Sequence, residues 1–488
     1  MSSKINGFLT SKGNNIIDKI LIHVVPFRYN QSYSEFVNNM KNRGYETSEW
    51  NEDVENDLYD YIQEELNDDD NSLGTVLFKE NSFNAFIAFN PNGEKIDLSV
   101  RGAKLFVYKN NLAFFVYCIE SNQIRISDCL MEFQNRYKEF SYPQAALLIE
   151  KDSKKKVCAP IYLGAWIAKE FDNIPITYLP SRNNPYQTLQ SGFDLYMPKN
   201  WKLEFDDNGN NIKVIPDKAI CFSYAKFKNN HKYKLEQIED FAYHIAKGYS
   251  SKYKFSKDGS YEMSYPFHNT VWCAANEGYT YVVYNTEDNL KFYTQTLPSR
   301  LKEVYLYLFI RSLFERYSIL KYSHTVASKF PYNIKEYNNI KTQNEISSLQ
   351  KDVNVFKTKV MTKEVSTISH VNGYYSLLNK SFHNDDNSIS LIKNLKSLND
   401  IQKQADSDRL NYFLAVIATI ELLFATPQLF SLIKLVFSLD NVNSISELFL
   451  VNKIAFIIFI CLCFVVIGSL VSVIYYIIKK RINSKEPY

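Results

Sequence analysis

The chain has 488 residues, with 56 Lys and Arg against 53 Asp and Glu, so its formal net charge is only +3. This length exceeds one typical domain and predicts two or three folding units. The near-neutral charge argues against strong nonspecific binding to nucleic acid, so no direct nucleic-acid partner is expected.

Residues 1–142 are predicted to form an α+β domain. Its first element is a buried strand at Lys19–Phe27, which is rich in β-branched residues. Two helices are expected next, at Ser34–Arg43 and Asn51–Leu66, because their apolar residues recur at helical spacing. Five short strands are then expected between Thr75 and Ile119, separated by turns that contain Asn and Gly.

A second α+β region is predicted at residues 143–297. It should contain a helix at Ile161–Phe171, a hairpin within Trp201–Ile215 and an amphipathic helix at Leu235–Lys247. Three strands are expected between Tyr261 and Tyr284. The pattern leaves open whether this region and the preceding one share a single sheet.

No catalytic constellation is recognisable in the sequence. It contains no GxxxxGK[ST], GxGxxG, GxSxG or HExxH motif, and its seven histidines lack the spacing of metal ligands. We therefore predict that the chain is not an enzyme and assign no catalytic residue, no cofactor and no resident metal ion.

The segment Thr270–Gly278 is locally unusual. Trp272 and Asn276 could line a ligand pocket there, or Trp272 could be an ordinary core residue.

Residues 298–409 are predicted to form a helical stalk. Ser299–Lys329 is dense in Leu, Tyr and Phe and predicts one long helix. Apolar residues then recur at alternating steps of three and four, which is typical of a coiled coil between chains, although an ordinary packed helix would show the same short pattern. These residues are Ile346, Leu349, Val353, Phe356 and Val360, followed by Leu391, Leu395 and Leu398. Ile389–Arg409 contains no Pro or Gly, so one helix could continue from the stalk into the next segment.

Residues 410–478 are predicted to form a two-helix transmembrane hairpin. Leu410–Phe437 is largely apolar, and Ile454–Ile478 has 25 residues without a charge. About 20 apolar residues are enough to cross a bilayer as a helix. Basic residues flank the hairpin at both ends, including the tail at 479–488, whereas the loop between the spans has few. Both termini are therefore expected in the cytoplasm of a bacterial cell, with the hairpin in the inner membrane.

The first predicted span carries a carboxylate, Glu421, near its middle. Such a group costs roughly 2.5–3.5 kcal/mol in a bilayer and usually faces protein or water. Gln428 follows on nearly the same helix face, and Pro427 should kink the helix. Two interpretations remain: these residues line or gate a pore formed by several copies of the chain, or a protonated Glu421 bonds to the second helix, for example at Ser469.

This layout resembles the CorA-like superfamily of two-span divalent-cation channels. The shared features are an α+β head, long helices, a helix that enters the membrane, a short outer loop and a second span with a basic tail. The family's Gly-Met-Asn motif is absent, and the matching segment Phe437–Asn443 instead carries Asn441 and Asn443 in the predicted outer loop. The resemblance implies a membrane-embedded homo-oligomer, a pentamer in the family, and a divalent cation such as magnesium as the transported ion.

Within that superfamily, the enlarged head and the lost motif are similar to the CorA-like membrane effectors of type III CRISPR systems. That resemblance implies a channel gated by a small nucleotide second messenger bound to the head, which causes ion leakage or membrane disruption in antiviral defence. Two alternatives remain open. One is a CorA-like divalent-cation transporter without a second messenger, and the other is a membrane-anchored binding protein.

Overall fold

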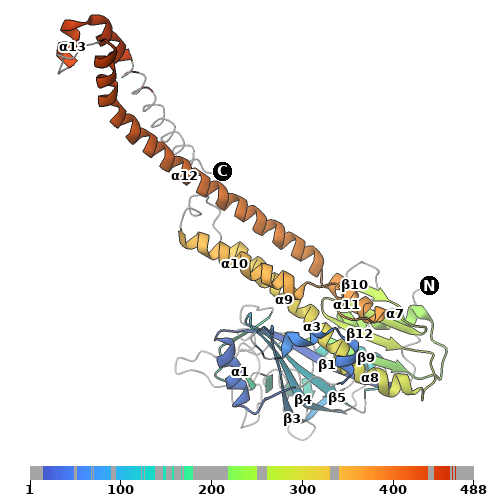
Figure 1. Cartoon of the computed structure of the whole chain (residues 1–488). Helices are drawn as coiled ribbons and strands as arrows, with labels where there is room; N and C mark the ends of the chain where they lie inside the picture. The colour runs from blue at the N-terminus through green and yellow to red at the C-terminus, as the bar shows by residue number, and fades with distance from the viewer. Residues whose placement is uncertain are drawn as a thin grey trace. The chain divides into compact units, whose positions relative to one another are not determined.

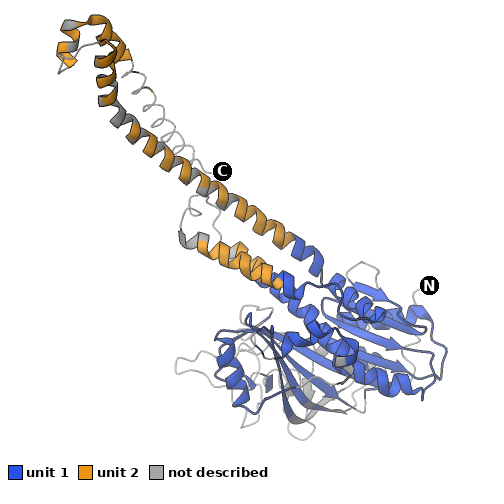
Figure 2. Cartoon of the chain, viewed as in Figure 1, with its two compact units in different colours: residues 1–321, 357–389 blue, residues 322–356, 390–488 orange. Residues whose placement is uncertain are grey.

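The computed structural model describes residues 15–48, 52–67, 69, 71–89, 95–121, 124–125, 127–137, 147–149, 156–158, 166–167, 170–179, 218–249, 261–329, 340–437, 445–461, 464 and 468. The chain divides into two compact units (Figure 2). Unit 1 comprises Met1–Lys321 and Lys357–Ile389, and unit 2 comprises Tyr322–Phe356 and Ser390–Tyr488. The boundary predicted between residues 142 and 143 lies outside the described residues.

A ten-stranded sheet forms the centre of unit 1 (Figure 1). Its order is β10-β11-β12-β9-β1-β5-β4-β3-β2, with β8 paired to β1. The central strand β1 (Ile16–Tyr29) is antiparallel to β5 (Leu112–Glu120) on one side and to β9 (Ile220–Phe227) on the other. Because β5 and β9 come from the two predicted α+β regions, these regions share one sheet.

The remaining strands are β2 (Glu46–Thr47), β3 (Gly74–Phe89), β4 (Lys95–Tyr108), β8 (Ile176–Tyr178), β10 (Tyr261–Ser264), β11 (Thr270–Ala275) and β12 (Gly278–Val283), with β6 (Leu147–Ile149) and β7 (Lys156–Cys158) forming a separate pair. The five strands expected between Thr75 and Ile119 are thus three long ones, β3, β4 and β5. Two of the four predicted breaks, near residues 80–82 and 101–103, are register shifts within a strand instead, and Gly102 takes a left-handed φ of +66° at the shift in β4.

Helices cover the sheet on both faces. α7 (Leu235–Lys247) packs with Phe241 against Phe227, at 4.9 Å between ring centroids. α9 (Leu306–Lys329) packs with Phe309 against Phe222, at 5.4 Å. Phe222 and Phe227 are an odd number of residues apart in β9 and therefore point to opposite faces of the sheet. The prediction of α7 is confirmed, and Gly248 ends the helix in a left-handed conformation.

Burial on both faces explains the apolar sequence of β1, in which every residue from Ile20 to Phe27 is buried. His23 lies inside this run, with its two ring nitrogens 3.2 Å from Tyr117 Oη and 3.2 Å from Gln134 Oε1. Burial lowers the pKa of His23 to about 4. The imidazole is therefore neutral at physiological pH and belongs to the core.

The single helix predicted at Asn51–Leu66 is wrong. The segment forms α2 (Glu52–Asp57), α3 (Asp60–Gln63) and the 3₁₀ turn η1 (Glu64–Leu66). The break falls at Tyr59, whose backbone is extended, with φ −63° and ψ 147°. The Tyr59 N–H bonds instead to the Val365 carbonyl, at 3.1 Å. This tertiary bond overrides the helical pattern and leaves η1 to present Glu65 to the core.

The helix predicted at Ser299–Lys329 begins earlier and is irregular. It contains a π-helical turn η2 (Phe292–Thr296), α8 (Leu297–Arg300), a second π-helical turn η3 (Leu301–Tyr305) and α9. Pro298 has no N–H to donate, so regular α-helical bonding cannot continue through it. Further helices are α1 (Tyr33–Lys41), α4 (Ser127–Tyr137), α10 (Ile340–Val360), α11 (Ser369–Ser381), α12 (Asn384–Val436) and α13 (Ile445–Val451).

In unit 2 the heptad-like side chains are buried within one chain. Ile346, Leu349, Val353 and Phe356 of α10 and Leu391, Leu395 and Leu398 of α12 are each at most 8% exposed. Gln350 Nε2 of α10 donates to the Leu395 carbonyl of α12 at 3.5 Å. This is the ordinary packed-helix alternative, and it leaves these side chains unavailable as a contact between chains.

A second apolar contact in unit 2 closes the end of α12 against the segment that follows. Ile433, Ala455 and Phe459 are buried together there. Asn452 Oδ1 accepts the backbone N–H groups of Ile454 and Ala455, both at 3.1 Å, and so caps the helical residues 453–461. The end of α12 thus packs against the helical segment 453–461, while the two-helix transmembrane hairpin over residues 410–478 stays a prediction.

No helix within the described residues is both long enough and apolar enough to span a membrane.

Most of the second predicted span, the basic tail at 479–488 and the hairpin expected within Trp201–Ile215 lie outside the described residues. Of the helix expected at Ile161–Phe171, the structure describes residues 166–167 and 170, which are helical, and Phe171, which lies in a turn.

Candidate functional site

The two residues predicted to line a ligand pocket lie in different environments. Trp272 in β11 is 2% exposed, and its ring is surrounded by three tyrosines at centroid distances of 5.6 to 6.3 Å. These are Tyr281, Tyr305 and Tyr374. Asn276 lies at the β11–β12 turn, partly exposed, with its carbonyl accepting from Arg316 Nη1 at 3.2 Å. Trp272 thus has the packing of a core residue, whereas a ligand contact by Asn276 stays a prediction.

The predicted pore residues lie in α12. Glu421 and Gln428 both have exposed side chains, and their separation of seven residues puts them on one face of the helix. The backbone remains helical through Pro427. Asn441 and Asn443, expected in the outer loop, lie outside the described residues. The pore assignment therefore stays a prediction.

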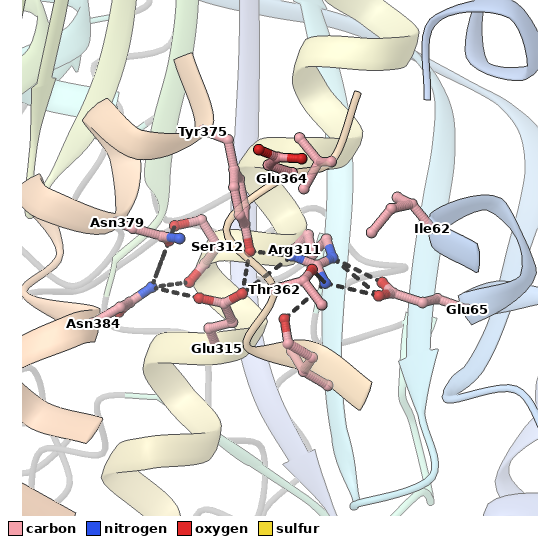
Figure 3. Close-up of polar contacts among 12 residues, drawn as sticks. Ile62, Glu65, Arg311, Ser312, Glu315, Thr362, Glu364, Tyr375, Asn379 and Asn384 are labelled. Atoms are coloured by element: carbon pink, nitrogen blue, oxygen red, sulfur yellow. Dashed lines mark hydrogen bonds and ion pairs between the residues drawn. The ribbon is translucent and has the colours of Figure 1, made fainter. Parts of the chain in front are cut away.

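A group of buried charges that was not evident from the sequence lies in unit 1 (Figure 3). Arg311 of α9 is completely buried, and Glu65 of η1 and Glu315 of α9 are almost completely buried. Tyr375 of α11 and Asn384 at the start of α12 complete the group. We call these five residues the ionic cluster. It joins segments more than 300 positions apart in the sequence.

Arg311 and Glu65 form the stronger ion pair of the cluster. Arg311 Nε lies 2.9 Å from Glu65 Oε2, and Nη2 lies 2.8 Å from Glu65 Oε1, so the guanidinium binds both carboxylate oxygens. Tyr307 donates its hydroxyl to Glu65 Oε2 at 3.1 Å. Arg311 Nη2 also donates to the Val360 carbonyl at 2.7 Å. Such bidentate geometry fixes η1 against α9 and the end of α10.

Glu315 is held by weaker and more varied contacts. Arg311 Nη1 donates to Glu315 Oε1 at 3.2 Å, and the Tyr375 hydroxyl donates to the same oxygen. Asn384 Nδ2 approaches Glu315 Oε2 at 3.5 Å and donates to the Ser312 carbonyl at 2.9 Å. The other half of the cluster thus contacts α11 and the first residue of α12.

Electrostatics distinguish the two carboxylates. The pKa of Glu315 is raised to about 7, mainly by burial and also by the negative charges of Glu65 and Asp385, which together outweigh the lowering by Arg311 and the Tyr375 hydroxyl. Burial lowers the pKa of Arg311, but Glu65 and the other acidic groups outweigh that effect and raise it well above its ordinary value. The guanidinium therefore stays charged, while Glu315 changes its charge near neutral pH.

The sequence does contain one sign of the cluster. Arg311 and Glu315 are four residues apart inside an otherwise apolar run of α9. Charges on the buried side of such a helix are rare unless they are paired. The partner Glu65 could not be found from sequence, because it lies 246 positions earlier, in the segment Asn51–Leu66, and meets Arg311 only in the folded chain.

The arrangement connects segments that are distant in the sequence. Within the described residues, no three His, Cys, Asp or Glu side chains are placed to hold a metal ion. The cluster instead brings η1, α9, α11 and the start of α12 to one point.

Comparison with known proteins gives little. No family model matches the chain, and no curated protein matches it. One solved structure is similar over 54% of this chain and 91% of its own: the complete structure of the CorA magnesium transporter from Methanocaldococcus jannaschii. Its sequence identity is 9% and its TM-score is 0.21.

Proposed function

We propose that the chain is an inner-membrane protein whose C-terminal hairpin enters the bilayer and, in a homo-oligomer, forms an ion path controlled by the α+β head. The single observation that carries this proposal is α12. It is one uninterrupted helix of 53 residues, from Asn384 in the ionic cluster to Val436 at the hairpin.

Exposed apolar side chains support the membrane part of the proposal. Large apolar residues with at least 40% of their surface exposed recur along the end of α12 and the hairpin, and Leu435 and Leu450 exceed 75%. They are Leu410, Phe413, Leu414, Ile417, Leu432, Leu435, Val436, Ile445, Phe449, Leu450, Ile454, Ile457, Ile458 and Phe464. Covering such a surface with lipid removes it from water at roughly 25 cal/mol per Å².

Glu421 and Gln428 support the ion-path part. Both side chains are exposed in the single chain and lie on one helix face. A carboxylate at this depth is costly against lipid but favourable where it meets water and cations. One hairpin cannot surround a channel, so several copies of the chain are required. Because the heptad-like side chains of α10 and α12 are buried within one chain, we place the contact between copies at the hairpin.

The test is ion flux through liposomes that contain the full-length protein. We expect Glu421→Ala and Gln428→Ala to lower cation flux, Glu421→Ala by tenfold or more, because the carboxylate concentrates cations in the path. Glu447→Ala in α13 is the matched control, since its exposed carboxylate lies outside the predicted spans. Equal flux in all variants would contradict the assignment of Glu421.

The same preparations separate the alternatives. A membrane-anchored binding protein predicts no flux in the wild type, and predicts that Glu421→Leu only improves insertion, by roughly 2.5–3.5 kcal/mol. A transporter without a second messenger predicts flux that responds to magnesium alone. Recovery of the wild-type protein in the soluble fraction would contradict the membrane proposal as a whole.

The proposed signal is a small nucleotide bound to the head, in the context of antiviral defence. Its support is the resemblance of layout to ligand-gated CorA-like effectors, together with the direct connection between the head and α12 through Asn384. Calorimetric titration of nucleotide second messengers tests the ligand class, and Asn276→Ala tests the residue. Absence of any heat of binding would remove the nucleotide from the proposal without affecting the flux experiment.

A further inference from the structure

Two arginines of unit 1 have opposite surroundings. Arg311 is buried among acceptors for its guanidinium, which include both oxygens of Glu65 and the Val360 carbonyl. Arg28 lies near the end of the central strand β1 and is half-buried. Its Nε is buried without a hydrogen-bond partner, and Arg28 forms no ion pair with any residue that the structure describes. Because buried polar groups of folded proteins are almost always paired, this unpaired guanidinium is unusual.

The positive charge of Arg28 is not compensated within the described part of the chain. Burial lowers the pKa of its guanidinium, and no acidic group there raises that pKa again. The reverse holds for Arg311, whose pKa is raised well above its ordinary value by Glu65 despite its burial. Since arginine is not deprotonated in proteins, Arg28 carries a charge that an anion would balance.

The sheet leaves Arg28 accessible from one side. Arg28 pairs with Leu112 of β5 on one side and with Thr177 of β8 on the other. Residues directly opposite each other in antiparallel strands point to the same face of the sheet, with Cβ atoms about 4.5–5.5 Å apart. Leu112 is 1% exposed, whereas the Thr177 side chain is exposed. Arg28 therefore lies where the covered part of this face ends, with a hydroxyl as its neighbour on the open side.

A second cation lies at the same end of the sheet. Phe114 of β5, two residues after the partner of Arg28, contacts Tyr317 of α9 at 6.1 Å between ring centroids. Residues two apart in a strand share a face, so α9 covers the face that carries Arg28. One turn further along α9, Lys321 donates its ammonium to the Asn110 carbonyl, in the turn that precedes β5. The charges of Arg28 and Lys321 thus add at this end of the face and favour an anion.

We propose that Arg28 and Thr177 form a binding site for a phosphate group, with Lys321 as a supporting positive charge. A guanidinium forms two parallel hydrogen bonds with a phosphate, and a threonine hydroxyl donates a further one. Phosphate fits better than a carboxylate, because the guanidinium alone occupies both oxygens of a carboxylate. The phosphate group can be free phosphate or part of a nucleotide. The site requires neither the ion path nor the nucleotide signal, so it can hold or fail independently of the proposed function.

The test is thermal unfolding of the full-length protein in detergent, with phosphate or chloride added at equal ionic strength. A ligand that binds only the folded state raises the unfolding midpoint as its concentration increases. We expect phosphate to raise the midpoint beyond any effect of chloride. Arg28→Met should lower the affinity for phosphate on the order of tenfold or more, because charge-assisted hydrogen bonds are lost. Thr177→Val should lower it roughly threefold, because one neutral hydrogen bond is lost.

Stability without phosphate separates a binding residue from a structural one. Arg28→Met removes a half-buried charge that has no partner among the described residues, so its midpoint in phosphate-free buffer should equal or exceed that of the wild type. Arg300→Met is the matched control, because Arg300 is also half-buried but pairs with Asp57 at 3.2 Å. This control should lower the phosphate-free midpoint and keep the shift that phosphate causes.

Titration with AMP and with a cyclic dinucleotide distinguishes the two sources of the phosphate group. Nucleotide binding that is tighter than that of inorganic phosphate and is lost in Arg28→Met assigns the site to a nucleotide, whereas equal or weaker binding assigns it to free phosphate. Either result supports the site. The proposal is overturned if phosphate and chloride act alike, if Arg28→Met or Thr177→Val binds phosphate as the wild type does, or if Arg28→Met lowers the phosphate-free midpoint as Arg300→Met does.

Discussion

Arg311→Met is expected to lower the free energy of unfolding of the head by about 3–5 kcal/mol, because removing one partner of a buried ion pair leaves the other charge uncompensated. Here two carboxylates, Glu65 and Glu315, would lose their common cation, and the Val360 carbonyl would lose its donor. Met has a similar length but no donor. Denaturant unfolding of the full-length protein, followed by circular dichroism, measures the change.

Two controls make this result specific to the cluster. Lys104→Met removes the cation of a partly exposed pair with Glu303 and should cost less than about 1 kcal/mol. The combination of Arg311→Met with Glu65→Gln and Glu315→Gln removes all three charges and should recover part of the loss. If Arg311→Met and Lys104→Met cost the same, the buried cluster is not the main connection that we infer.

Trp272→Ala is expected to destabilise the head by a similar amount, about 3–5 kcal/mol, through the cavity it leaves. The indole is 2% exposed and fills the space between Tyr281, Tyr305 and Tyr374. This space joins β11, β12, η3 and α11, so collapse on one side would disturb the others. Thermal unfolding monitored by near-ultraviolet circular dichroism would report both the lost stability and the loosened aromatic packing.

The matched control is Trp272→Phe, which keeps an aromatic ring and should cost clearly less than the alanine variant. The experiment also decides between the two interpretations of this residue. If Trp272 were a ligand contact and not a core residue, the alanine variant would lose ligand affinity and keep its unfolding midpoint. A stability loss in the apo protein is the result that the packing predicts.

Local sequence patterns were sufficient to predict several elements of the fold. β1 and α7 are short, strongly patterned segments whose residues face one environment along their length, so their periodicity is clear. α12 was foreseen as a continuous helix because Ile389–Arg409 contains no residue that would end it. Each of these features depends on residues close together in the chain.

Features that depend on distant partners could not be predicted. The helix break at Tyr59 depends on the Val365 carbonyl, more than 300 positions later. The union of two regions in one sheet depends on β1 pairing with both β5 and β9. The heptad-like pattern of α10 was correct in its spacing but did not reveal its partner, which is α12 of the same chain.

The same reason explains what was missed in the site. Glu65 and Arg311 are recognisable as a pair only when the fold brings η1 against α9. Glu421 and Gln428, in contrast, stand out in the sequence because a polar residue in an apolar run is visible without knowledge of its neighbours. Sequence therefore identified isolated polar residues and overlooked those whose significance is their partnership.

The position of β1 also has a consequence for synthesis of the protein. Ile22 of β1 pairs with Cys118 of β5 and with Phe222 of β9. At about 5–20 residues per second, β9 leaves the ribosome roughly 10–40 s after the strand with which it must pair. During that interval one edge of an apolar strand stays open, and pairings between such distant segments form slowly. Nascent chains of this protein are therefore expected to need protection by chaperones until β9 has been made.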